Sequence, residues 1–89
     1  MTTRTLRIVN EKGLHARAAA KFVEVVEAHD AGAAVEKGGL RVAGDSIMGL
    51  LTLGAGRDSE ITVHTEGAQA AALAEALDEL VAGRFGEPM

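Results

Sequence analysis

A histidine and an arginine stand two residues apart, at His15 and Arg17, where a turn-like stretch leads into an expected helix. The first turn of a helix has unpaired N–H groups and carries the positive end of the helix dipole, so it attracts anions. The N–H groups of Ala16 and Arg17 would point at the oxygens of a phosphate group, and the Arg17 guanidinium would add a forked positive charge. The same positive end favours the neutral imidazole, which is the nucleophilic form. These residues indicate an anion site of undefined purpose, although an ordinary polar turn before a helix has the same residue types.

A serine marks a second helix start. Ser46 precedes an apolar run, and serine is a preferred N-cap because its hydroxyl accepts a hydrogen bond from an N–H of the first helical turn. The helix expected over 47–51 is short, so only one of its sides can face a core. The run nevertheless holds more large apolar residues than one side needs, namely Ile47, Met48, Leu50, Leu51 and Leu53.

Along the chain, apolar residues recur at every second position in some stretches, as in strands, and at every third or fourth position in others, as in helices. Four stretches have strand character and three have helical character: strands over 6–9, 33–37, 40–42 and 60–65, and helices over 16–28, 47–51 and 68–82. Gly38-Gly39 favours a tight hairpin, because both glycines can take positive φ. Two long helices with one apolar side each need one sheet to cover. The sequence therefore predicts an α/β fold of the α+β type. It is a two-layer open-faced sandwich whose four-stranded, mainly antiparallel sheet is covered on one face by two long helices and one short helix.

Length and composition restrict the class of protein. The 89 residues suit one domain, 1–89, in which the segment 84–89, with Pro88, is expected to fray. The formal net charge of −4, with no basic stripe and no aromatic stacking platform, argues against a nucleic-acid partner. The absence of cysteine excludes disulfides and thiol chemistry. We find neither an apolar signal region nor the ~20 apolar residues of a membrane span. We expect a cytoplasmic monomer with no membrane insertion.

Two segments together resemble a known family. Gly13-Leu14-His15-Ala16-Arg17, followed by an alanine-rich helix, resembles the active-site signature of HPr, the histidine-containing phosphocarrier of the bacterial phosphoenolpyruvate-dependent phosphotransferase system (PTS). The stretch from Asp45 to Leu53 resembles the regulatory serine of the family and its short helix. The spacing between these motifs, the chain length and the element order agree with the same family. One position departs from it: Ala18 stands where many members have a proline, which pre-sets φ in the first helical turn.

The resemblance implies a carrier that acts between two partners and is not itself an enzyme. Enzyme I, charged by phosphoenolpyruvate, would phosphorylate His15 on Nδ1. Arg17 and the backbone N–H groups of Ala16 and Arg17 would stabilise the phosphate. The phosphoryl group would then pass to a histidine of an EIIA-type domain, and no cofactor or metal is implied. Three alternatives stay open: a regulatory, nitrogen-type relay of the same family without sugar transport, a non-covalent anion-binding α/β domain, and a structural adaptor that would tolerate His15→Ala.

Regulation and docking are also implied by the resemblance. Ser46 matches the serine that the ATP-dependent HPr kinase/phosphorylase modifies, and a phosphate there would repel an acidic partner while leaving the helix intact. Partners would cover an exposed apolar surface formed by Ala20, Ile47, Met48 and Leu51. The plain alternative is that Ser46 is only an N-cap and that the apolar residues belong to the core.

No role is expected for the other two histidines. His29 lies near a helix end, and His64 should point to the polar side of its strand. A three-histidine metal site is not expected, because the elements that carry these residues lie apart in the expected order.

Overall fold

The computed structural model describes every residue from Met1 to Met89. The elements follow in the order β1 (Thr2–Arg7), α1 (Ala16–Glu27), β2 (Gly32–Lys37), β3 (Leu40–Ala43), α2 (Ile47–Thr52), β4 (Glu60–Glu66) and α3 (Ala70–Ala82), and a short turn over Arg84–Gly86 comes after α3. The order of helices and strands is the one expected from the sequence. None of the helices combines the length and the apolar character that crossing a membrane requires.

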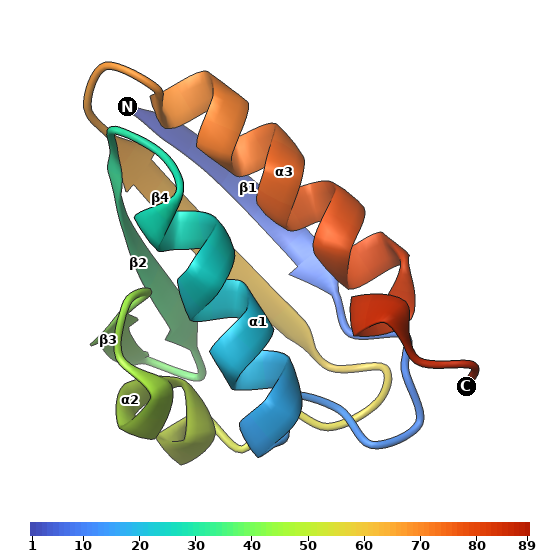
Figure 1. Ribbon diagram of the computed structural model, residues 1–89. Coiled ribbons are helices and arrows are strands. Elements are labelled where there is room, and N and C mark those ends of the chain that lie inside the picture. The colour runs from blue at the N-terminus through green and yellow to red at the C-terminus, as the bar shows by residue number, and fades with distance from the viewer.

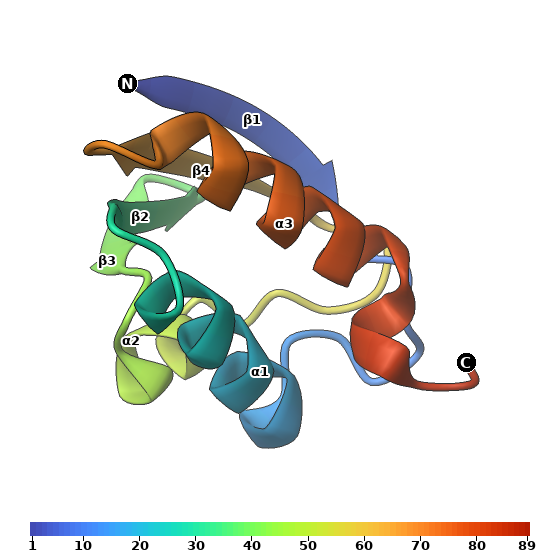
Figure 2. The same cartoon turned by 45° about the horizontal axis from the view of Figure 1, so that its top comes forward.

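The sheet has four strands in the order β1-β4-β2-β3, and every neighbouring pair is antiparallel. Figure 1 shows α1 and α3 running across one side of this sheet. Figure 2, turned so that the top comes forward, shows that both helices lie in the same layer and leave the other side of the sheet open. The short helix α2 packs beside α1 and β3. The predicted open-faced sandwich is therefore confirmed.

The core lies between the two layers. In β4 the side chains of Ile61, Val63 and Thr65 are buried, and those of Thr62 and His64 between them are not, which is the period of a half-buried strand. The helices contribute apolar stripes at helical spacing, with Ala18, Ala19, Phe22, Val23 and Val26 from α1 and Ala70, Leu73, Ala74, Leu77 and Val81 from α3. Burying one large apolar side chain stabilises the fold by about 1.5–3 kcal/mol.

The strand boundaries show what local pattern predicts well and what it does not. The hairpin forms as expected: Lys37 pairs with Leu40, and Gly38 and Gly39 have φ of +56° and +86°. The first strand, expected over 6–9, instead spans Thr2–Arg7, because its whole length pairs with β4. Ladder pairing therefore sets the strand ends where apolar alternation is weak.

The segment 84–89, expected to fray, is packed onto the molecule. Phe85 is fully buried, and Lys21 Nζ donates a hydrogen bond to its carbonyl oxygen at 2.6 Å. The backbone N–H of Glu11 donates to the carbonyl of Met89 at 3.0 Å. Pro88 led us to expect fraying, whereas the structure packs this segment against the core, because Phe85 provides an apolar anchor.

Candidate functional site

Three segments far apart in the sequence meet around His15. They are the β1–α1 loop, the α2–β4 loop and the segment after α3, which lie together at the lower right of Figure 1. The N–H of Leu14 donates to Ala55 O at 2.9 Å, and the bond from Glu11 to Met89 joins the first segment to the third. The surroundings of His15 are therefore built by the tertiary fold as well as by its own loop.

Gly13 sets the direction in which the chain reaches His15. Its φ is +66°, a region that L-residues rarely adopt. A Cβ at this position would lie 2.6 Å from Ala55 O and 2.8 Å from the Cα of Gly56. Only glycine fits both the backbone conformation and this close approach. The N–H of His15 in turn donates to Gly13 O at 3.0 Å.

His15 is the N-cap residue of α1, in an extended conformation, and its ring makes no capping hydrogen bond. Its carbonyl accepts from the N–H of Ala19 at 2.8 Å. The N–H groups of Ala16, Arg17 and Ala18 precede the first intrahelical bond and find no backbone partner. Arg17 is exposed and pairs with no acidic side chain. Ala18 is fully buried, so the helix start offers the exposed N–H groups of Ala16 and Arg17 and one free guanidinium.

The ring of His15 contacts a carboxylate that the sequence analysis did not single out. Nε2 is hydrogen-bonded to Glu87 Oε2. The other carboxylate oxygen, Oε1, accepts from Asn10 Nδ2 at 2.9 Å, and the same amide donates to Gly13 O at 2.8 Å. The hydrogen bond from Asn10, then that from His15, holds the pKa of Glu87 below its ordinary value, against the opposing effect of burial.

A depression of about 520 Å³ opens beside His15. It is lined by Glu11, Lys12, Ala16, Arg17, Glu87, Pro88 and Met89. Two acidic and two basic side chains share this depression with the imidazole, so its local charge is balanced. The positive pair lies in the β1–α1 loop and in the first turn of α1, where an anion would approach.

Sequence reasoning missed Asn10 and Glu87. Asn10 opens a turn, and asparagine at that place commonly bonds to the backbone of its own turn, so a partial signal existed. Glu87 gave no local sequence signal, because its partner His15 lies 72 residues earlier in the chain.

The second predicted helix start has the expected cap. Ser46 Oγ accepts from the N–H of Gly49 at 3.0 Å, so the N-cap prediction is confirmed. Of the residues expected at an exposed apolar surface, Met48 is 72% exposed and Ile47 is 40% exposed, which excludes a plain core role for both. Leu51 is half-buried against the core, and Ala20 is half-buried on α1.

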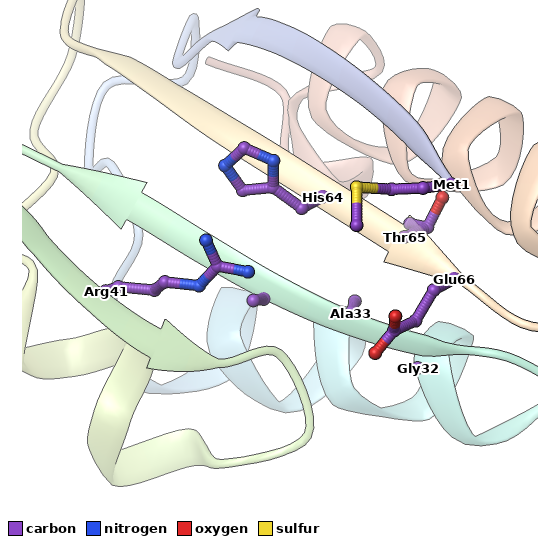
Figure 3. A pocket seen from close by; sticks show the side chains of 8 residues that line it. Met1, Gly32, Ala33, Arg41, His64, Thr65 and Glu66 are labelled. Carbon is purple, nitrogen blue, oxygen red and sulfur yellow. The ribbon is translucent and has the colours of Figure 1, made fainter.

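The other histidines lie apart from His15. His29 Nδ1 is hydrogen-bonded to Val25 O at 2.8 Å near the end of α1. His64 lies on the open face of the sheet between Thr3 and Glu36, with ring contacts of 3.1 and 2.9 Å. His64 and Arg41 are among the residues that line a pocket on this face (Figure 3). The structure contains no cluster of three histidine, cysteine or acidic side chains that could hold a metal ion.

Comparison with known proteins gives consistent matches. The family model described as "PTS HPr component phosphorylation site" matches residues 2–83. The phosphocarrier protein HPr of Neisseria meningitidis serogroup A is 40% identical over 87 residues, which is 98% of each chain. That of Pseudomonas aeruginosa is 42% identical over 83 residues, 92% of each chain.

Solved structures agree with the sequence matches. HPr-C-His from Thermoanaerobacter tengcongensis superposes with a TM-score of 0.95 at 35% identity and covers both chains completely. The phosphocarrier protein HPr from Bacillus anthracis superposes with a TM-score of 0.86 at 38% identity, over 90% of this chain and 95% of that one. The likeness therefore extends over sequence and fold together.

Proposed function

The chain belongs to the HPr family of phosphocarriers of the phosphotransferase system, and we propose that it takes a phosphoryl group from Enzyme I on Nδ1 of His15 and passes it to a histidine of an EIIA-type domain in the cytoplasm. In the first transfer the lone pair of Nδ1 forms a bond to phosphorus. The N–P bond of the donor histidine breaks, and its electron pair stays on the donor nitrogen. In the second transfer His15 is the donor. The acceptor histidine of the EIIA-type domain forms the new N–P bond, and the electron pair of the broken bond returns to Nδ1 of His15.

The start of α1 is the observation that carries this proposal. The free N–H groups of Ala16 and Arg17 supply hydrogen-bond donors beside His15, and the helix dipole adds partial positive charge at the same point. The exposed Arg17 guanidinium adds a full charge without leaving another partner. Charge on the transferring phosphoryl group is stabilised by groups that are already in place, so no reorganisation of the protein is needed during the reaction.

Intact-mass measurement tests the acceptor directly. Wild type and His15→Ala are incubated with Enzyme I and phosphoenolpyruvate. We expect the wild type alone to gain one acid-labile phosphoryl group. If the wild type gains no mass while the same Enzyme I phosphorylates another HPr, the proposal is wrong. Saturable phosphate binding without covalent change would then favour the anion-binding alternative.

We further propose that partners dock on the apolar surface of α2, centred on Ile47 and Met48. Support comes from the exposure of these two large apolar side chains on a helix that packs beside α1. We expect Met48→Glu to slow phosphorylation by Enzyme I about tenfold, the effect of losing one strong interface contact. Leu40→Glu is the matched control, because Leu40 is an exposed apolar residue on β3. Equal loss in both variants would contradict the location.

Ser46 is the proposed regulatory position. Its hydroxyl already lies at the N-terminus of α2, where a phosphate group is electrostatically favourable, so modification would leave the helix intact. The added charge would then act on docking at the adjacent Ile47 and Met48. We expect HPr kinase/phosphorylase and ATP to modify wild type but not Ser46→Ala, and the modified wild type to accept phosphate from Enzyme I more slowly. Unchanged acceptance would exclude the regulatory role.

A further inference from the structure

We propose that Glu87 is a positioning residue for His15: its carboxylate holds the hydrogen of Nε2, so that Nδ1 carries the lone pair that attacks phosphorus. This inference rests on the proposed function of His15 as phosphoryl acceptor. Glu87 lies in the segment after α3, beyond residues 2–83 that the family model matches. The chemistry therefore draws on a residue outside the matched region.

The hydrogen bond between Nε2 and Glu87 Oε2 determines the tautomer of the ring. An ionised carboxylate can only accept, so the hydrogen must belong to Nε2. A neutral imidazole has a single N–H, and Nδ1 is then unprotonated. The pKa of Glu87 is held below its ordinary value, first by the hydrogen bond from Asn10 and then by that from His15, which keeps the carboxylate ionised at neutral pH.

Asn10 fixes the orientation of the carboxylate. Its side chain is fully buried, and its amide nitrogen donates to both Gly13 O and Glu87 Oε1. Its own Oδ1 has no hydrogen-bond partner. Turning the amide over would set Oδ1 against two acceptors, so the observed orientation is the one that the site permits. With Oε1 held by Asn10, Oε2 is the oxygen left for His15.

The backbone that delivers Glu87 is anchored. Phe85 is fully buried, and Lys21 Nζ binds its carbonyl oxygen at 2.6 Å. Arg84 and Phe85 have φ of +60° and +54°, a conformation that costs free energy in residues other than glycine and persists only where the surroundings hold it. Glu87 therefore reaches His15 from a fixed turn.

The same contact balances charge during transfer. As the N–P bond forms at Nδ1, the imidazole that keeps its Nε2 hydrogen becomes positively charged. The Glu87 carboxylate compensates this charge on the Nε2 side of the ring, as the acid of a catalytic triad stabilises its imidazolium. A phosphoryl group on Nδ1 would be stabilised by the N–H groups of Ala16 and Arg17 and by the Arg17 guanidinium.

Substitution of Glu87 separates this role from a structural one. Glu87→Gln keeps the side-chain size and can keep the bond from Asn10 through Oε1, but it turns an amide N–H toward Nε2 and so favours the Nδ1–H tautomer. We expect phosphorylation by Enzyme I to slow about 10- to 100-fold, the size of a lost charge-assisted hydrogen bond. Glu87→Ala, in which the ring is free to adopt either tautomer, should slow it less. A merely structural role predicts the opposite order.

The second readout is the tautomer of His15 in the unphosphorylated protein, from nitrogen NMR of the labelled ring. We expect Nε2–H in wild type and Nδ1–H in Glu87→Gln. Glu11→Gln removes the same charge from the same depression without contacting the ring, and should keep the wild-type tautomer. Equal rates in wild type and both Glu87 variants, or Nδ1–H in wild type, would overturn the role of Glu87. Failure of wild type to accept phosphate would instead overturn the function of His15, and the NMR would still decide whether Glu87 sets the tautomer.

Discussion

Asn10 shows how a single buried side chain can connect a turn to a distant carboxylate beside His15. Its amide donates one hydrogen bond within the β1–α1 loop, to Gly13 O, and another to the segment after α3, at Glu87. Its unpaired Oδ1 opposes folding, since a buried acceptor without a partner costs about 1–3 kcal/mol. This cost falls at the point where the two segments meet beside His15. The two hydrogen bonds that Asn10 donates there hold the segments together.

Gly13→Ala should destabilise the protein more than an alanine at another glycine of positive φ. Both Gly13 and Gly38 have positive φ, but a Cβ at Gly38 would meet nothing within 4 Å, whereas one at Gly13 would meet Ala55 O at 2.6 Å. Gly38→Ala is therefore a control for backbone strain alone, about 1 kcal/mol. We expect urea unfolding to show a loss of at least about 2 kcal/mol for Gly13→Ala. Equal losses of unfolding free energy in the two variants would show that the α2–β4 loop moves to accommodate the added Cβ.

Acid should remove the contribution of Glu87 to stability. The pKa of Glu87 is lowered from its ordinary value of 4.5, chiefly by the hydrogen bond from Asn10, so the unfolded chain takes up this proton at a higher pH than the folded protein does. The stabilisation is present above about pH 4.5 and is lost as the pH falls through the lowered pKa. We expect the difference in unfolding free energy between wild type and Glu87→Gln to shrink over that range in urea titrations. A difference that stays constant down to the acid limit would contradict the assignment.

Among the elements, α2 depends most on its surroundings. It has six residues, far fewer than the ~12–15 that an isolated helix needs to be even marginally stable in water. The contacts that hold it include the Ser46 cap on the N–H of Gly49, the fully buried Leu50 and the half-buried Leu51. Because one side is anchored this way, the outer residues Ile47 and Met48 stay in a defined position on the surface.

Loss of the α2 cap should be measurable in stability. We expect Ser46→Ala to lower the unfolding free energy by about 1 kcal/mol, since the N–H of Gly49 loses its acceptor. Ser46→Asp should retain most of the stability, because aspartate is an equally good N-cap and its charge is favourable at a helix N-terminus. Chemical unfolding of the three proteins checks this order. An aspartate variant as unstable as the alanine variant would show that the hydroxyl acts in some way other than as a cap.

At the scale of the whole molecule, the segment after α3 joins the core to the site. Phe85 belongs to the same buried cluster as Phe22 of α1 and Leu77 of α3. Two residues farther on, Glu87 contacts His15. The packing of the two layers and the surroundings of His15 are therefore coupled through one short stretch of chain.

Phe85→Ala should damage both stability and phosphoryl acceptance. Removing a fully buried phenylalanine costs about 3–5 kcal/mol, a large part of the ~5–15 kcal/mol that stabilises a typical domain. The released segment would also free His15 from Glu87. We expect a clear fall in the thermal midpoint, and slower phosphorylation at temperatures where the variant remains folded. Met89→Ala, which removes a side chain from a residue that is 66% exposed, serves as the control and should change the stability little.

Much of this protein could be predicted from short stretches of sequence. Alternation through Ile61 and Val63 indicates β4, Gly38-Gly39 indicates the hairpin, and Ser46 before an apolar run indicates α2 and its cap. The start of α1 at His15, with its free backbone N–H groups, belongs to the same class of feature. All of them depend on contacts between residues a few positions apart, so the local order of residue types determines them.

Only the tertiary structure decided the strand order β1-β4-β2-β3, the full length of β1 and the place of segment 84–89. It also determined which acidic side chain contacts His15. Glu87 meets His15 and Asn10 across 72 and 77 residues of chain. No periodicity in sequence can indicate such pairs, because their distance depends on how the layers pack and on where Phe85 is buried. The candidate acceptor His15 can thus be predicted from its own loop, whereas its contact with Glu87 is determined by the packing of the folded core.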